Sequence, residues 1–313
     1  MPAIELSNGE ARLIARPDLG AGLTAFDVLH DGIWQAIFRR VDPSTAHPFA
    51  LSNILLVPFS GRVSGGGFTF DGTFHALPRN VETELYPIHG NGFSAAWDVA
   101  SLSADLLTLT LSAEGPGPFR YDATMSYRLQ GAGLLMELSL VNRARIRLPY
   151  GAGFHPWFVR EPDTTLHAPA RGVWLEQSDH LPKAHDAITA QADLDFNRPK
   201  PLPARWINNW FDGWDGKARI HWPSRGLAVD VDASEGLRQY VVFSPAAAAD
   251  FFCFEPVTHP VDAFNLPGKA EAHGLKILER MNRWPSLPVS PQTLAEHVVS
   301  HGFPAQRQFQ NAR

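Results

Sequence analysis

Apolar and polar residues alternate along much of this chain with a period of two, not the 3.6 of a helix. The alternation is clearest in residues 105–112, 121–129 and 134–141, and in the first of these stretches three leucines share one face. Such alternation predicts half-buried antiparallel strands. Turn-forming residues separate the three stretches, at 114–118 and again at 131–133, so we expect hairpin connections between them.

Shorter alternating stretches occur elsewhere in the chain, and helical patterns are scarce. We expect further strands at residues 3–7, 11–16, 24–29, 67–70, 227–232 and 239–243. The best helical candidate is 291–300, with Ser290 as a possible cap and Pro291 in the first turn, and a weaker one covers 270–281. The pattern therefore predicts an all-β fold, a large antiparallel β-sandwich with few short helices.

Nothing in the sequence marks a domain boundary. The 313 residues contain no Pro/Ser-rich linker, no charge run and no internal repeat. All-β folds often exceed the usual domain size, so we expect residues 1–313 to form a single domain. The 26 prolines, 25 glycines and 9 tryptophans suit many short strands joined by turns, with aromatic surfaces that can pack a core or face a ligand.

Charge and hydropathy exclude several classes of function. The formal net charge is -5 and no basic block is present, so nucleic acid is not an expected partner. No apolar run approaches the roughly 20 residues of a membrane span, and the first residues do not resemble a secretory signal. We therefore expect a cytoplasmic protein without a membrane partner. Cys253, the single cysteine, lies in an apolar run and is interpreted as a packed core thiol.

Two glycine-rich segments carry candidate binding residues. Arg62 sits between turn-forming residues, where its fork of donors could hold ligand hydroxyl groups. Residues 65–67 are three glycines, but they lack the Gly-Lys-Ser/Thr ending of a phosphate loop. His89 is followed by glycine, which would let the backbone approach a ligand closely. Taken singly, these two residues are better explained as a solvated surface arginine and a turn histidine.

Two further segments carry candidate acid–base groups. His155 lies among small and aromatic residues, which suggests a confined imidazole able to act near neutral pH. A core histidine bonded to backbone is the alternative. Glu255 ends a strongly apolar strand, where burial would raise its pKa and make it a better base.

The histidines do not form a persuasive metal site. Glu255 and His259 are four residues apart, as one helical turn would require, but the prolines at 256 and 260 argue against a helix. His180 and His185 are five apart in a loop-like stretch, and there is no cysteine cluster. A zinc site is therefore unsupported, and we expect no metal.

In this order, these segments resemble the aldose 1-epimerase, or galactose mutarotase, family. Residues 58–72 match Pro-aromatic-x-x-Arg leading into Gly-x-Phe-x-Phe-x-Gly, and 77–80 match Leu-Pro-x-Asn. Residues 89–97 give His-Gly with a following tryptophan. Residues 151–158 match Gly-x-Gly-x-His-Pro-aromatic-Phe, and 255–265 match Glu-Pro-x-Thr-His-x-x-Asp-Ala-Phe-Asn. The resemblance runs from about residue 10 to residue 280.

The resemblance implies a β-supersandwich fold with an open cleft that binds one monosaccharide, and it implies no cofactor. In such an enzyme Glu255 would remove the proton of the anomeric hydroxyl and His155 would protonate the ring oxygen. Arg62 and His89 would contact the sugar. We expect His155 and Glu255 to face one cleft, within reach of opposite ends of the sugar ring.

The chain departs from the family pattern in two places. Asn208 occupies the position at which many relatives have an aspartate that contacts the sugar, and Asp212 could substitute for that residue only with a shift of four positions. The tail has Leu-Glu-Arg-Met-Asn at 278–282 where relatives usually show an Ala-Pro-Gly turn, so residues 278–313 are interpreted as a remodelled C-terminal extension without a role.

The sequence therefore predicts an isomerase that interconverts the α and β anomers of a free monosaccharide. Two alternatives remain open at this point. One is a non-catalytic sugar-binding or sensing module on the same scaffold, because a fold does not determine a function. The other is an epimerase that acts on a phosphorylated or otherwise modified sugar.

Overall fold

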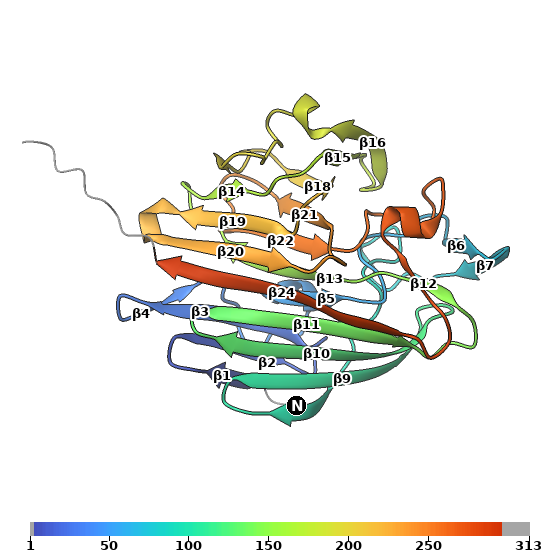
Figure 1. Ribbon diagram of the computed structural model, residues 1–313, viewed down its shortest axis with the longest axis horizontal. Coiled ribbons are helices and arrows are strands. Elements are labelled where there is room, and N and C mark those ends of the chain that lie inside the picture. The colour runs from blue at the N-terminus through green and yellow to red at the C-terminus, as the bar shows by residue number, and fades with distance from the viewer. Residues whose placement is uncertain (1–2, 296–313) are drawn as a thin grey trace, which may run out of the picture.

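The computed structural model describes residues 3–295, and most of their regular structure is β-strand. Two large antiparallel sheets dominate (Figure 1). The 11-stranded sheet has the order β1-β2-β3-β5-β13-β22-β21-β18-β15-β16, with β4 paired to β3, and the 9-stranded sheet has the order β17-β14-β19-β20-β24-β11-β10-β9-β8. Two small two-stranded sheets, β6-β7 and β12-β23, complete the fold. The large antiparallel β-sandwich that the sequence predicts is thereby confirmed.

The strands of the 11-stranded sheet are β1 (Ile4–Ser7), β2 (Ala11–Arg16), β3 (Gly22–His30), β4 (Ile33–Ala36), β5 (Asn53–Leu56), β13 (Gly153–Val159), β15 (Gly172–Glu176), β16 (Pro182–Ala187), β18 (Ile207–Asp212), β21 (Gln239–Ser244) and β22 (Phe251–Val257). Those of the 9-stranded sheet are β8 (Asp98–Leu102), β9 (Leu106–Glu114), β10 (Arg120–Gln130), β11 (Gly133–Asn142), β14 (Thr165–His167), β17 (Lys200–Pro201), β19 (Lys217–Trp222), β20 (Leu227–Ala233) and β24 (Arg283–Ala295). The small sheets comprise β6 (Gly67–Phe70), β7 (Thr73–Ala76), β12 (Leu148–Tyr150) and β23 (Lys276–Leu278). Four short 3₁₀ helices are η1 (Pro48–Ala50), η2 (Ile188–Ala190), η3 (Pro223–Arg225) and η4 (Ala270–His273).

The main core lies between the two large sheets. Alternate residues of β9, β10 and β11 point into it, including Leu107, Met125, Tyr127 and Leu138, all fully buried. Because successive side chains of a strand point to opposite faces, the intervening residues are more exposed. All the strands expected from the alternation are present, with bounds that differ by a few residues.

The helix expected over residues 291–300 is wrong where the structure can test it. Residues 291–295 form the end of β24, and the remainder of that stretch lies outside the described residues. β24 runs between β11 and β20 and pairs with both. This segment is a strand because it pairs through its backbone with a neighbouring strand on each side. Trp284, Leu287 and Val289 are also buried in the core. The weaker helix at 270–281 reduces to η4 followed by strand β23.

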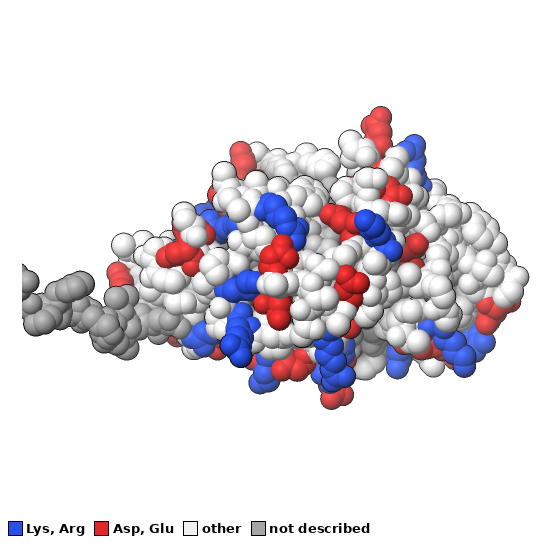
Figure 2. All heavy atoms as spheres, turned by 90° about the horizontal axis from the view of Figure 1, so that it is seen from above, with Lys and Arg blue, Asp and Glu red and all other residues white. Residues whose placement is uncertain are grey.

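Charged side chains of both signs are mixed on the surface shown in Figure 2. Figure 2 shows one face of the molecule, on which Lys and Arg side chains are interspersed with Asp and Glu side chains. That face therefore presents no extended basic area of the kind that follows a phosphate backbone. Within residues 3–295, no helix has the length and apolar composition that crossing a membrane requires.

The face of the 11-stranded sheet turned away from the core carries a second apolar cluster. It contains Leu51, Ile54, Leu56, Phe93, Trp157, Trp210, Val241, Cys253, Val257 and Val261. The long connection between β5 and β8 returns to this face, since residue 57 bridges to residue 90 and residue 62 to residue 88. A polar site can therefore form between this sheet face and the covering loops.

Candidate functional site

Strand alternation separates core residues from site residues on the two central strands β13 and β22. Phe252 and Phe254 point into the main core, whereas Cys253 and Glu255 lie on the opposite face of the sheet. On the neighbouring strand, His155 and Trp157 share that outer face. The apolar strand that ends in Glu255 thus fixes the direction of its carboxylate. Cys253 is fully buried, which confirms the interpretation of a packed thiol.

His155 and Glu255 lie side by side. The distance from His155 Nε2 to Glu255 Oε1 is 3.2 Å, and the two residues are 8% and 3% exposed. Both face one cavity, as expected, but the expectation that they would reach opposite ends of a sugar ring is wrong. The physical reason is that the anomeric hydroxyl and the ring oxygen of a sugar are bonded to the same carbon. An acid and a base that serve both oxygens must be neighbours.

Burial moves the pKa values of this pair in opposite directions. Removal from water disfavours each charged form, so the pKa of Glu255 lies well above its usual value and that of His155 falls to about 3. The charge of Arg62 works against the shift in Glu255. Both shifts favour the uncharged forms, so over a wide range of pH the pair carries one acidic proton, which lies on Glu255 in the favoured form. Such a pair can accept a proton at one atom while it donates one at another.

Trp157 forms the floor beneath His155. The two rings stack with centroids 4.0 Å apart and an interplanar angle of 22°. Arg39 also packs on Trp157, with its guanidinium 4.5 Å from the Trp157 ring and 4.8 Å from that of Phe251. Arg39 also lines the cavity and donates hydrogen bonds to the backbone carbonyls of residues 49 and 51. This cation was not singled out from the sequence, because no turn or motif marks it.

His89 is held as a hydrogen-bond donor. Its backbone has φ of 59°, and its N–H donates to the carbonyl of Gly61 at 2.9 Å. Its Nδ1 accepts the N–H of Gly61 at 3.0 Å, so the neutral ring carries its proton on Nε2. Burial, together with the charges of nearby basic groups, lowers the pKa of His89 well below the usual value. The ring meets that of His155 edge to face, with centroids 5.7 Å apart.

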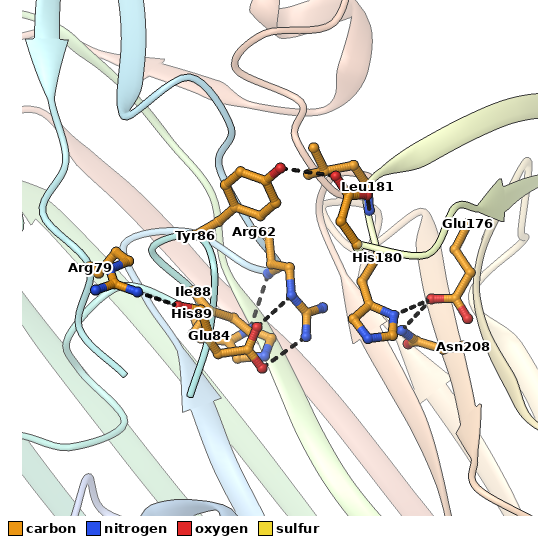
Figure 3. A network of polar contacts seen from close by, with 12 residues as sticks. Arg62, Arg79, Glu84, Tyr86, Ile88, His89, Glu176, His180, Leu181 and Asn208 are labelled. Atoms are coloured by element: carbon orange, nitrogen blue, oxygen red, sulfur yellow. Dashed lines mark hydrogen bonds and ion pairs between the residues drawn. The ribbon is translucent and has the colours of Figure 1, made fainter. Parts of the chain in front are cut away.

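Arg62 reaches the cavity in a fixed orientation. Its Nε and Nη2 donate to the two carboxylate oxygens of Glu84, at 2.7 and 2.9 Å. The Arg62 side chain is 12% exposed, so the alternative of a solvated surface arginine is wrong. Glu84 was not singled out from the sequence, because its partner lies 22 residues earlier and no spacing rule links them. Figure 3 shows this pair on one side of the site, beside His89.

The opposite side of the site is built from β18 and the turn between β15 and β16. Asn208 lines the cavity and its Nδ2 donates to Glu176 at 2.9 Å (Figure 3). Asp212, the suggested substitute for an aspartate at this position, is bonded to His185 and does not line the cavity. A shift of four residues along a strand moves a side chain about 13 Å, which is why Asp212 cannot take that place.

The two sides of the site are linked at one point. The hydroxyl of Tyr86 donates to Asp179 Oδ2 at 2.9 Å, which joins the loop carrying Arg62's partner to the β15–β16 turn (Figure 3). This hydrogen bond raises the pKa of Tyr86. Burial raises the pKa of Asp179, but the hydrogen bonds that its carboxylate accepts, from the Leu181 N–H and from Tyr86 among others, outweigh burial and lower that pKa.

The cavity between the two sides has a volume of about 370 Å³. Its aromatic lining consists of Phe49, Trp157, Trp206, Trp210, Phe243 and Phe251. Aromatic faces pack well against the C–H faces of a small polar ring, while a few polar groups orient it. All five residues proposed from the sequence, namely Arg62, His89, His155, Asn208 and Glu255, line this one cavity.

His259 supports the site from behind and does not line it. It is fully buried, its Nδ1–H donates to the carbonyl of Pro260 at 2.8 Å, and its Nε2 accepts the N–H of Ser60 at 3.1 Å. Both ring nitrogens are therefore used to hold backbone. The suggested metal pairing of His259 with Glu255 is excluded by these contacts, and His180 and His185 bind two different carboxylates.

Within the described residues, one group has metal-ligand spacing. The ligand atoms of His155, Cys253 and Glu255 lie within 4.8 Å of one another. Burial, together with the charge of Glu255, raises the pKa of the Cys253 thiol well above its usual value. A thiol must lose its proton to bind zinc, so this set is poorly suited to a metal, and an ion there would occupy both acid–base groups.

The buried neutral histidines predict a loss of stability in acid. The pKa of His259 falls to about 4 because burial disfavours its charged form. An unfolded histidine titrates near 6.5, so between about pH 6.5 and 4 the unfolded state binds more protons and stability falls as the pH falls. His259 alone should contribute a loss of about 3 kcal/mol, and His155 and His89 act in the same direction. Glu255 acts in the opposite direction, because burial raises its pKa and the native state therefore binds its proton first as the pH falls. Urea unfolding of Glu255→Gln at pH 7, 6, 5 and 4 measures the contribution of the histidines, and a free energy of unfolding that stays constant in this variant down to pH 5 would contradict it.

Comparisons with known proteins agree with this geometry. The family model described as aldose 1-epimerase matches residues 2–274. The uncharacterized protein YphB of Escherichia coli is 38% identical over 245 residues, which cover 76% of this chain and 84% of that protein. A crystal structure of a candidate aldose 1-epimerase from Escherichia coli K12 superimposes with a TM-score of 0.86 at 31% identity, covering 94% of this chain and 99% of that one. A galactose mutarotase-like protein from Clostridium acetobutylicum gives a TM-score of 0.81 at 20% identity, covering 94% and 95%, and supports the fold alone.

Proposed function

This chain belongs to the aldose 1-epimerase family, and we propose that it interconverts the α and β anomers of a free monosaccharide. The observation that carries the proposal is the contact of 3.2 Å between His155 and Glu255 inside the aromatic cavity. Binding alone requires no acid–base pair. Two titratable groups with opposite pKa shifts at adjacent positions are the arrangement that general acid–base chemistry requires.

In the proposed reaction the acidic proton of the pair first passes from Glu255 to His155 across their 3.2 Å contact, after which Glu255 acts as the base and His155 as the acid. The carboxylate takes the proton of the anomeric hydroxyl, and the freed electron pair forms the C1 carbonyl as the bond from C1 to the ring oxygen breaks. His155 supplies a proton to that oxygen, which gives the open-chain aldehyde. After rotation about C1–C2, the ring closes on the other face of the carbonyl, and both protons return. The pair holds one proton in total before and after the cycle.

The other lining groups bind and orient the sugar. Arg62 is fixed by Glu84 and His89 is fixed by Gly61, so each presents donors without a large loss of side-chain entropy. The charge of Arg62 keeps the pKa of Glu255 lower than burial alone would set it. Asn208 contributes from the opposite side. The aromatic residues limit the access of water and pack against the ring.

The test is a measurement of α/β exchange by NMR saturation transfer across a panel of aldoses and sugar phosphates. Sugars mutarotate slowly unaided, so each rate is compared with a blank without protein. We expect acceleration well above the blank for at least one aldose. Binding without acceleration would show a binding module, and acceleration restricted to sugar phosphates would show an enzyme for modified sugars. Either result would contradict the proposed function.

A further inference from the structure

A single carboxylate behind one side of the cavity holds three of its lining side chains. Glu176 Oε2 accepts hydrogen bonds from Asn208 Nδ2 at 2.9 Å and from His180 Nδ1 at 2.8 Å, and its Oε1 accepts from Trp206 Nε1 at 2.6 Å. Asn208, His180 and Trp206 line the cavity, whereas Glu176 does not. The Glu176 side chain is 17% exposed. The Glu176 oxygens therefore bind protein side chains, and it is the three partners that face the cavity.

The chemistry of a carboxylate fixes how two of these partners face the cavity. An ionised carboxylate only accepts hydrogen bonds, so Asn208 must turn its NH₂ group toward Glu176. The Asn208 carbonyl oxygen then remains for a ligand. In the same way His180 must carry a proton on Nδ1, which leaves its Nε2 for a ligand. Figure 3 shows His180 and Asn208 converging on the Glu176 carboxylate.

The two sides of the cavity consequently have complementary chemistry. On one side Arg62 and His89 present N–H donors, since Glu84 and Gly61 fix their orientation. On the other side the Asn208 carbonyl oxygen presents an acceptor and His180 presents its Nε2. A ring hydroxyl group both donates and accepts, so a polyol ring placed between the two sides can satisfy each of them. A buried site that pairs every hydroxyl discriminates strongly against sugars that lack one.

We propose that Glu176 is the positioning residue of a hydroxyl-recognition site formed by Asn208 and His180, and that this site selects the sugar. The proposal rests on the proposed function for the identity of the ligand as a monosaccharide. It assigns the negative charge on this side of the cavity to position 176 and a neutral amide to position 208. Recognition of the sugar then requires that one of these two positions carries a carboxylate and the other an amide.

The test exchanges the charge between the two positions. In Asn208→Asp, two carboxylates meet at the 2.9 Å contact and repel each other, so KM for the preferred sugar should rise about 10-fold or more. kcat should stay within about threefold, because His155 and Glu255 are unchanged. In Glu176→Gln/Asn208→Asp, the new amide keeps an oxygen for Trp206, and its NH₂ donates to the new carboxylate at position 208 and to Nδ1 of His180, which takes its other tautomer. The double variant should recover KM to within about threefold of wild type.

A matched control uses the next residue of β18. Asn209 is also buried, but its side chain points to the other face of the sheet and its Nδ2 donates to the Trp174 carbonyl at 3.0 Å. Asn209→Asp introduces the same charge one residue away. Adding Glu176→Gln to this variant should not lower its KM for the preferred sugar. Thermal unfolding of every variant separates loss of fold from loss of recognition. Sugar binding is also followed by tryptophan fluorescence, since Trp206 lies at the site.

Each outcome decides the proposal. It is overturned if Asn208→Asp binds sugar as well as wild type does, if the double variant is no better than Asn208→Asp, or if wild type binds no sugar of the panel. It is supported if Glu176→Gln restores sugar binding when it is added to Asn208→Asp and does not improve sugar binding when it is added to Asn209→Asp. Recovered binding in a protein that accelerates no exchange would uphold this recognition site while it refutes the proposed catalysis, so the two failures are distinguishable.

Discussion

Glutamine in place of Glu255 should slow anomer exchange by about 10³-fold, near the middle of the range for loss of a positioned base. The amide has nearly the same size as the carboxylate and can still contact His155 Nε2, which lies 3.2 Å from Glu255 Oε1 in the native protein. It cannot accept the proton of the anomeric hydroxyl. NMR saturation transfer with the preferred sugar measures the rate, and KM should change far less than kcat.

The control for this substitution is Glu137→Gln on β11. Glu137 lies in the other large sheet and its carboxylate accepts a hydrogen bond from Ser286, away from the cavity. We expect exchange at the wild-type rate in this variant. If Glu255→Gln kept a rate within about threefold of wild type, Glu255 would not be the base, and His155 or a bound water would have to take that role.

Alanine in place of Gly90 should produce a large loss of stability. Gly90 has φ of 72°, and a Cβ there would lie 2.2 Å from the carbonyl oxygen of Val57 and 2.4 Å from Cδ of Pro58. Since these are backbone and ring atoms, the loop must move away from the end of β5. We expect a loss of about 4 kcal/mol or more in the free energy of unfolding, measured by urea unfolding, together with weaker sugar binding because His89 moves with the loop.

Gly66→Ala is a matched control for that substitution. Gly66 has φ of 73°, almost the same as Gly90, but a Cβ there would meet no atom within 4 Å. This variant carries only the cost of a left-handed alanine, about 1 kcal/mol. The difference between the two variants isolates the close approach of the His89 loop to Val57. Equal losses would show that this packing does not matter.

The sequence was sufficient to predict much of the site, because alternation along a strand determines which side chains share a face. In residues 251–257 the aromatic residues 252 and 254 enter the core, and this forces Glu255 to the other face of the sheet. The motif residues Arg62, His89 and His155 come from three separate segments, and the resemblance to a family was needed to bring them together. Their convergence on one cavity is what the structure adds.

Two features could not be predicted, for different physical reasons. β24 contains prolines at 285, 288 and 291, and proline removes a backbone donor and is disfavoured inside a sheet. The burial of Trp284, Leu287 and Val289 between two partner strands overrides that local preference. Glu176 was not predicted because its partner Asn208 is 32 residues away in the sequence. No local sequence pattern indicates which hydrogen-bond donors a carboxylate will contact in the folded chain.

The position of β24 in the 9-stranded sheet also has a consequence for synthesis of the protein on the ribosome. β20 and β11 are both hydrogen-bonded to β24 and not to each other, and β24 is the last of the described strands to be made. At ordinary translation rates β11 must wait on the order of ten seconds for its neighbour. During that interval the nascent chain exposes two unpaired strand edges, which are prone to pair with other chains. We therefore expect this half of the sandwich to close late, and to depend on chaperones or slow synthesis more than the 11-stranded sheet does.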